Sequence, residues 1–188
     1  APLAIYAHRD LQPILDTMVA FFVVHLNFEL QFHPLPDTPG ATIYADRQLP
    51  VSTIPLHHRI PTMGFKFEEH PLPPNIYPEV IEKYALTRQE IATLKRGEDV
   101  LLESGDVLST TEALYQRRNP RSFAYMSDTL YTAAAAEYVE GVDLLYHEAT
   151  YMQALIQLAK DTGHSTALQA ATFAKLANVK RLLLGHYS

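Results

Sequence analysis

The sequence predicts a layered α/β domain, and three observations support that prediction. Strand-like and helical segments alternate through the last third of the chain in the order β-α-β-α-α-β. Near the start, a short apolar strand is followed by the apolar spacing typical of an amphipathic helix. The chain of 188 residues is 47% hydrophobic and 19% charged, which is ordinary for one globular domain with a core.

The first third is expected to hold one helix among several short strands. Asp10 stands where it can cap a helix that runs through about Phe22, because apolar residues recur there every three or four positions. Pro13 falls in the first turn of that helix, where a proline is tolerated. Strands are predicted at residues 2–7, 28–32, 41–45, 51–56 and 64–67.

Residues 70–109 differ in character from the segments on either side. Four prolines between positions 71 and 78 break regular structure, and mixed charge follows from 86 to 98. Short helices are predicted at 78–84 and from Thr87, where Glu90 completes a capping box. Few apolar residues in this stretch are spaced regularly enough to form a buried face, so we expect it to be an inserted arm.

The last third gives the clearest pattern of elements. Strands are predicted at 122–127, 143–147 and 179–184, and the last is an apolar run of the kind buried on both faces of a sheet. Helices are predicted at 132–139, along an apolar stripe from 151 to 158, and from Thr166 to about Ala177. Thr166 and Gln169 form a second capping box at the start of that last helix.

Composition narrows the function classes. The chain has no cysteine, which excludes a disulfide framework and thiolate metal ligands and favours a reducing compartment, the cytoplasm. Its longest apolar stretch, residues 18–24, is too short to span a bilayer. The net charge of −6 argues against a pure phosphate-binding module, so any nucleic-acid contact would use local basic patches. The candidates are Lys95 and Arg96, and Arg117 and Arg118 with Arg121; a solvated surface is the alternative interpretation.

Four acid–base side chains are candidates for metal or phosphate chemistry: His58, Asp128, His164 and His186. Imidazole and carboxylate groups at strand ends are the ligands that a borderline divalent metal such as zinc takes. Asp128 directly follows a predicted strand and could bridge two metals with its two oxygens. It could equally cap a helix.

The histidines each carry a structural alternative. His186 follows Gly185 at a strand end, where α/β sites lie, although a lone histidine is more often a structural hydrogen-bonding group. Strand alternation places His58 on the face of Ile54 and Leu56, and His57 is its competitor.

His164 follows a glycine at a helix start, where an imidazole and backbone N–H groups can both face a phosphate. The alternative is a simple loop at the start of the helix. Glu148 could accept a hydrogen bond from a neighbouring imidazole and orient it, or it could be a solvated surface acid.

Taken in order, these motifs resemble those of ribonuclease Z, the tRNA 3′-processing endonuclease of the metallo-β-lactamase superfamily. They are Ser127-Asp128-Thr129, His147-Glu148-Ala149-Thr150, Gly163-His164-Ser165-Thr166-Ala167 and Gly185-His186-Tyr187-Ser188, preceded by Pro55-Leu56-His57-His58-Arg59-Ile60-Pro61 and Gly64-Phe65. The resemblance spans nearly the whole chain and is most specific in the last third.

The resemblance implies a metallo-β-lactamase-like αβ/βα sandwich with two zinc ions in each active site. By motif match, His58 would bind one zinc, Asp128 would bridge both and His186 would bind the other. These three side chains are therefore expected to meet at one rim of the fold. His164 and Glu148 would be the catalytic pair.

The resemblance also implies the reaction and the partners. The reaction would be removal of 3′ trailers from precursor tRNA by hydroxide attack on a phosphodiester, which leaves a tRNA 3′-OH. The arm within residues 70–109 would bind tRNA, and the protein would form a homodimer without a membrane or DNA partner.

Three departures from the family pattern modify this expectation. The upstream His-x-His-x-Asp-His motif is absent, so we expect residues 1–188 to be the C-terminal two-thirds of one domain, incomplete at the N-terminus and inactive alone. Ser127 stands where many members have glycine, and the arm keeps only Leu94-Lys95-Arg96-Gly97 of its signature. Two alternatives stay open: another metallo-β-lactamase-fold hydrolase of small esters or phosphodiesters, and a non-catalytic fragment that binds RNA or dimerises.

Overall fold

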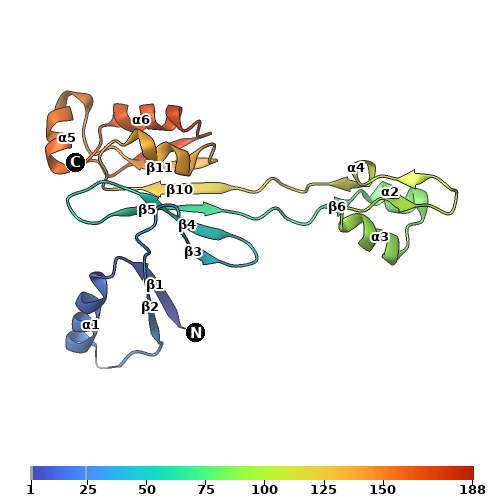
Figure 1. The fold of residues 1–188 in the computed structure, drawn as a ribbon, viewed down its shortest axis with the longest axis horizontal. Coiled ribbons are helices and arrows are strands. Elements are labelled where there is room, and N and C mark those ends of the chain that lie inside the picture. Colours follow the sequence, from blue (N-terminus) through green and yellow to red (C-terminus); the bar gives the residue numbers. More distant parts are fainter. Residues whose placement is uncertain (1, 24) are drawn as a thin grey trace. The chain divides into compact units, whose positions relative to one another are not determined.

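The chain folds into two units, one of which is inserted into the other. The computed structural model describes residues 2–23 and 25–188. The larger unit combines Ala1–Glu69 with Arg121–Ser188, and the smaller unit is His70–Pro120 (Figure 1). Each unit has its own apolar cluster of buried residues.

A six-stranded mixed sheet is the framework of the larger unit, in the order β12-β11-β10-β5-β4-β3. Its strands are β3 (Thr42–Ala45), β4 (Pro50–Pro55), β5 (Met63–Glu68), β10 (Ser122–Met126), β11 (Leu144–Glu148) and β12 (Leu182–Gly185). Strands β10, β11 and β12 run parallel, and β5 is antiparallel to both β10 and β4. β4 therefore points the same way as the three parallel strands, so four strands have their C-terminal ends at one edge of the sheet.

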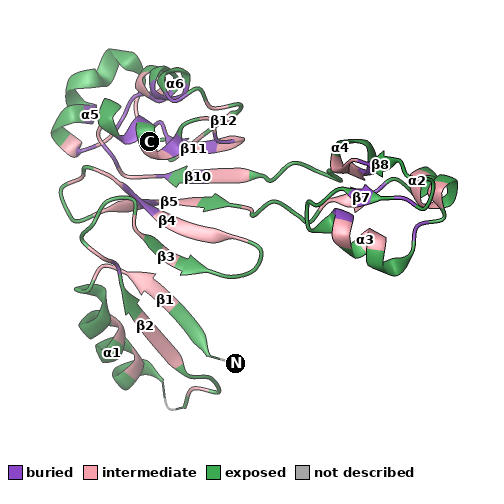
Figure 2. Cartoon of the chain, turned by 45° about the vertical axis from the view of Figure 1, so that its right-hand side comes forward, coloured by how far each residue is buried: buried purple, intermediate pink, exposed green. Residues whose placement is uncertain are grey.

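The core of the larger unit lies on one face of this sheet. There η1 (Ala133–Val139) and α6 (Ala167–Leu176) pack against alternate residues of the strands, and Ile54, Leu145 and Phe173 are fully buried (Figure 2). The expected capping box of Thr166 and Gln169 starts α6. The prediction of a last strand buried on both faces is wrong, because β12 is an edge strand whose Leu183 is 51% exposed.

Other elements of the larger unit are more exposed. β1 (Leu3–Ala7) and β2 (Leu30–Pro34) form a parallel pair connected through α1 (Leu11–Phe22). Asp10 precedes α1 as predicted, but its side chain makes no capping hydrogen bond, and none of the residues of α1, all of them described, is buried. The predicted apolar stripe from 151 to 158 became η2 (Gln153–Leu155) and α5 (Ile156–Thr162), where Leu155 and Leu158 are exposed.

The smaller unit is built from short elements. They are β6 (Asn75–Ile76), α2 (Pro78–Tyr84), α3 (Arg88–Lys95), β7 (Val100–Leu101), β8 (Val107–Leu108), α4 (Thr110–Ala113) and β9 (Leu114–Tyr115). The predicted capping box of Thr87 and Glu90 is present. The expectation that this stretch has little to bury is wrong: Leu94, Leu108 and Ala113 are at most 1% exposed and belong to one cluster. The unit continues to Pro120 rather than 109, because β9 returns to pair with β6.

No helix among the described residues combines the length and the apolar character that crossing a bilayer requires.

Candidate metal centre

Three ionisable side chains meet at the edge formed by the C-terminal ends of the strands. Asp128, His164 and His186 each offer one nitrogen or oxygen, and these atoms all lie within 4.8 Å of one another. Nε2 of His186 is 3.2 Å from Oδ1 of Asp128, and Nδ1 of His164 is 3.9 Å from the same oxygen. His186 and Asp128 supply an imidazole nitrogen and a carboxylate oxygen, which are ligands that a divalent ion such as Zn²⁺ takes, so the donor chemistry fits a metal.

Asp128 and His186 share an unusual backbone conformation with two other described non-glycine residues, Ala85 and Asn178, which follow helices. Asp128 lies two residues beyond β10 and His186 one residue beyond β12, and their φ angles are +52° and +58°. Non-glycine residues seldom adopt this left-handed conformation, and those that do concentrate at functional sites. The strain therefore supports a functional role at both positions.

His58 lies beside this group of three rather than within it. Its Nδ1 is 2.9 Å from the carbonyl oxygen of Gly163, and its ring centroid is 4.9 Å from that of His164. Gly163 has a φ of +84°, and a Cβ placed there would be only 2.7 Å from Nδ1 of His58. Glycine at 163 is therefore required both by the backbone and by the approach of His58.

The competitor His57 has a different environment. Its backbone N–H donates to Oγ1 of Thr129, and its Nδ1 is 3.4 Å from Oγ1 of Thr132. His58, the histidine that the face argument favoured, is thus the one whose ring lies next to that of His164. A cavity of about 380 Å³ lies beside both histidines and is also lined by Thr53 and Arg59.

Glu148 is fully buried beneath the three candidate ligands, which excludes the interpretation as a solvated acid. Its Oε1 accepts from the backbone N–H of Thr129 at 2.6 Å and lies 2.9 Å from Nδ1 of His164. Its Oε2 accepts from the backbone N–H of Ser165 at 3.1 Å and from the hydroxyl of Thr150 at 2.5 Å.

This set of donors keeps Glu148 ionised. Burial by itself would raise the pKa of the carboxyl, but hydrogen bonds from Thr150, Thr129, His164 and Ser165 together lower that pKa below its ordinary value. An ionised carboxylate can only accept hydrogen bonds, so Nδ1 of His164 donates to it. Only Nε2 of His164 is then available to a metal or a phosphate.

Two hydroxyl residues of the site, Ser165 and Thr150, had no separate role in the sequence analysis. Oγ of Ser165 donates to the carbonyl oxygen of Thr129 at 2.6 Å, which holds the loop before α6 against the end of β10. Oγ1 of Thr150 also lies 2.8 Å from Nδ1 of His186. The signal that could have identified them is their position in the motifs, where each stands one or two residues from an ionisable side chain.

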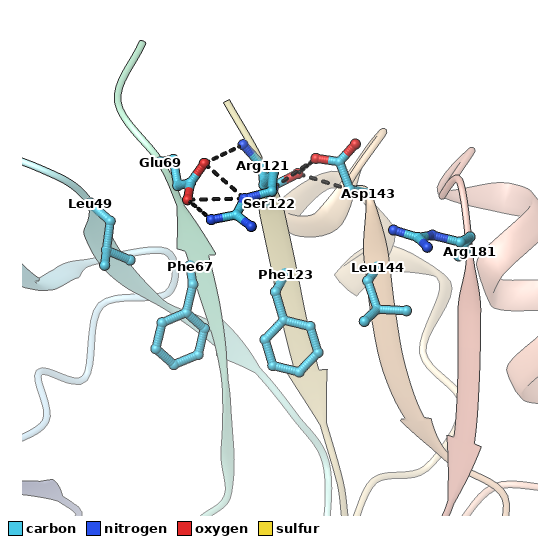
Figure 3. Close-up of a pocket in the computed structure, with 9 residues that line it drawn as sticks. All are labelled: Leu49, Phe67, Glu69, Arg121, Ser122, Phe123, Asp143, Leu144 and Arg181. Atoms are coloured by element: carbon cyan, nitrogen blue, oxygen red, sulfur yellow. Dashed lines mark hydrogen bonds and ion pairs between the residues drawn. The ribbon is translucent and has the colours of Figure 1, made fainter. Parts of the chain in front are cut away.

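The basic candidates for RNA contact lie away from this group in the chain. Lys95, Arg96, Arg117 and Arg118 are all exposed residues of the smaller unit. Arg121 differs, since it belongs to the larger unit and its guanidinium binds both carboxylate oxygens of Glu69 (Figure 3).

This ion pair borders a cavity of about 440 Å³. Figure 3 shows the side chains of Phe67, Phe123 and Leu144, which also line it, side by side on neighbouring strands. That cavity is lined by residues at the starts of β10 and β11, whereas the candidate ligands follow the strand ends.

Comparison with known proteins gives a consistent result at the level of sequence. No family model matches the chain. The chain is 39% identical over its full 188 residues to ribonuclease Z from Phocaeicola vulgatus, and 37% identical to ribonuclease Z from Bacteroides thetaiotaomicron. It spans 61% and 60% of the lengths of these two relatives. The resemblance to ribonuclease Z predicted from the motifs is confirmed.

Solved structures confirm the fold class. Human tRNase Z, short form, aligns with 100% of this chain and 61% of its own, with a TM-score of 0.62 and 24% identity. The metallo-β-lactamase fold protein YhfI from Bacillus subtilis aligns with 99% of this chain and 52% of its own, with a TM-score of 0.57 and 15% identity. The chain therefore has the predicted α/β, metallo-β-lactamase-like fold.

Proposed function

We propose that this chain supplies part of the active site of an endoribonuclease that removes 3′ trailers from precursor tRNA. All 188 residues of the chain align with ribonuclease Z sequences. The observation that carries the proposal is the meeting of Asp128, His164 and His186 at one sheet edge, within 4.8 Å of one another. The chain spans 61% of the Phocaeicola vulgatus relative, so activity, substrate and partners are proposed for the protein that contains this segment.

The proposed metal is Zn²⁺, with two ions in the complete active site. His58 would bind one ion, Asp128 would bridge the two and His186 would bind the other. When bound, the metal supplies Lewis-acid stabilisation of the negative charge that builds up during in-line displacement at phosphorus. Support comes from the donor chemistry of the site and from the 3.2 Å approach of His186 to Asp128.

His164 is proposed to act on the phosphodiester together with Glu148. Its side chain is only 12% exposed, and its ring stacks on that of His186 with a centroid distance of 5.3 Å. Because Glu148 holds Nδ1, a protonated His164 can donate from Nε2 to a phosphoryl oxygen or to the departing 3′ oxygen. The product would be a tRNA that ends in a 3′-OH.

The smaller unit is proposed to be the arm that binds tRNA. Lys95, Arg96, Arg117 and Arg118 would contact the phosphate backbone, because folded RNA is recognised mainly by shape and backbone. Assembly as a homodimer and a cytoplasmic location complete the proposal. The absence of cysteine is consistent with a reducing compartment.

Replacing His164 with alanine tests the assigned chemistry in the protein that carries this chain. We expect His164→Ala to lower kcat for precursor tRNA by about 10²- to 10⁴-fold, the usual contribution of a general acid. Binding of precursor tRNA, measured by filter retention, should change little, because the arm supplies most of the contact. His25→Ala, at an exposed position of the larger unit outside the site, is the matched control. Equal losses of turnover and binding in His164→Ala would contradict the role.

A further inference from the structure

We propose that Thr150 is a positioning residue that fixes the tautomer of His186 through the buried carboxylate of Glu148. Its hydroxyl lies 2.5 Å from Oε2 of Glu148 and 2.8 Å from Nδ1 of His186, so a single oxygen atom bridges the two side chains. This inference deepens the proposed function, because it concerns how one candidate metal ligand is prepared.

Proton counting decides the direction of each hydrogen bond. A threonine hydroxyl has one proton, and an ionised carboxylate has none. Glu148 is acceptor-only, because backbone N–H groups of Thr129 and Ser165 already point at its oxygens. The Thr150 proton must therefore lie toward Oε2 of Glu148. Its oxygen then accepts from His186, so Nδ1 of His186 carries the proton.

This tautomer leaves Nε2 of His186 as the nitrogen with the free lone pair. Nε2 is the atom that approaches Oδ1 of Asp128 at 3.2 Å, at the point where the candidate ligands converge. Imidazole binds a metal through an unprotonated nitrogen, and the partner of its other nitrogen selects the tautomer. Thr150 thus presents His186 to the metal in the form that can bind it.

The backbone holds Thr150 and His186 in register. Glu148 and Gly185 are paired residues of the parallel strands β11 and β12, and the N–H of Ala149 donates to the carbonyl oxygen of Gly185 at 2.8 Å. Beyond His186, the N–H of Ser188 donates to the carbonyl oxygen of Thr150 at 3.2 Å. Thr150 is 9% exposed, whereas the side chain of the neighbouring His186 is 41% exposed.

Glu148 consequently serves two histidines by different routes. It accepts directly from Nδ1 of His164 at 2.9 Å, and it reaches His186 through the Thr150 hydroxyl. Nε2 is therefore the nitrogen left without a proton in both neutral imidazoles. One buried charge orients both rings, which are stacked at 26° with centroids 5.3 Å apart.

Nuclear magnetic resonance of the metal-free protein tests the assignment directly in an Asp128→Ala background, which removes the competing acceptor 3.2 Å from Nε2 of His186. Long-range ¹H–¹⁵N spectra at about pH 8, above the ordinary pKa of histidine, report which imidazole nitrogen carries the proton. We expect the Nδ1–H form of His186 in this background when Thr150 is present. Thr150→Val, which keeps the shape and removes the hydroxyl, should shift His186 toward the Nε2–H form. Thr150→Ser, which keeps the hydroxyl, should restore Nδ1–H.

Zinc affinity provides a second readout that does not depend on RNA. Competition with a chromophoric chelator should show Zn²⁺ binding to Thr150→Val weakened by about 10- to 100-fold, and binding to Thr150→Ser close to wild type. If Thr150→Val does not fold, Thr150→Ala removes the same hydroxyl. The His186 tautomer and the Zn²⁺ affinity of Thr150→Ala then test the proposal in its place.

The proposal is overturned if His186 keeps the Nδ1–H form in Thr150→Val. It is also overturned if Thr150→Ser shows the same tautomer and Zn²⁺ affinity as Thr150→Val. Both readouts are independent of catalysis. A protein with the expected tautomer and zinc results that failed to cleave precursor tRNA would therefore contradict the proposed function and leave this inference intact.

Discussion

At the residue scale, the site combines two candidate ligands in a strained backbone conformation with a buried carboxylate whose hydrogen bonds are all made. Asp128 and His186 both have positive φ angles, while the carboxylate beneath them accepts hydrogen bonds from three neighbouring segments of chain. Strain of this kind costs stability and persists only where the surrounding structure enforces it. Here the strand ends and the hydrogen bonds of Glu148 enforce it, so the strained backbone lies at the residues proposed as metal ligands.

The strain at His186 can be measured by comparing two truncations. His186→Gly and His186→Ala both remove the imidazole, but only glycine adopts a φ of +58° without a steric penalty. We expect the glycine variant to have a free energy of unfolding about 1 kcal/mol higher than the alanine variant. Urea denaturation gives both values. A glycine variant that is less stable than the alanine variant would show that the backbone at 186 is not strained.

At the scale of elements, the direction of the strands brings distant residues together. β4, β10, β11 and β12 all end at the same edge, and the residues after them include His58, Asp128, Thr150 and His186. His164 comes from the loop before α6, where Gly163 and the capping box at Thr166 define the backbone. The smaller unit takes no part in this group and has its own core.

Deleting the smaller unit tests whether it serves tRNA binding alone, while the larger unit carries out phosphodiester hydrolysis. Glu69 directly follows β5 and Arg121 directly precedes β10, and the N–H of Glu69 donates to the carbonyl oxygen of Arg121 at 2.9 Å. An Asn-Gly turn can therefore replace residues 70–120. In the protein that carries this chain, we expect loss of precursor-tRNA cleavage and retained hydrolysis of bis(p-nitrophenyl) phosphate. Retained tRNA cleavage would favour a hydrolase of small esters or phosphodiesters instead.

At the scale of the whole molecule, charge and apolar surface are unevenly distributed. The core of the larger unit occupies one face of the sheet, and Tyr125 and Leu183 are exposed from the strands. Buried ionisable groups gather at the strand ends. Besides Glu148, the core contains His147, which is 1% exposed, packs 5.2 Å from the ring of Phe173 and donates from Nδ1 to the carbonyl oxygen of Glu148.

Burial of His147 predicts how stability depends on pH. Desolvation lowers the pKa of this histidine below its ordinary value of 6.5, so below pH 6.5 the unfolded chain binds a proton that the folded chain does not. Stability contributed by neutral His147 is therefore complete above pH 6.5 and falls as the pH decreases toward the lowered pKa, by up to about 1.4 kcal/mol per pH unit.

Unfolding free energies measured by urea titration between about pH 5 and 7 check this dependence. His147→Asn keeps a donor for the Glu148 carbonyl but does not titrate, and it should flatten the slope. His70→Asn, at an exposed position, is the matched control and should leave the slope unchanged. Equal slopes in all three proteins would mean that His147 does not control the pH dependence.

The sequence by itself predicted most of the strands, both capping boxes and the fold class, because hydrophobic period and capping chemistry are local properties. It also indicated the order of the site motifs, and it favoured His58 over His57 from strand alternation alone. The sequence did not predict the extent of the smaller unit. The apolar residues of its core come from helices and strands that are too short to show a hydrophobic period.

Only the tertiary structure decided which side chains act together. Burial of Glu148, the bridge through Thr150 and the left-handed backbone at Asp128 and His186 depend on the pairing of β10, β11 and β12. Residues 128, 148, 164 and 186 are far apart along the chain, so no local pattern contains the distances between them. A hydrogen bond is decided by a few tenths of an ångström, and that precision comes from the packed sheet.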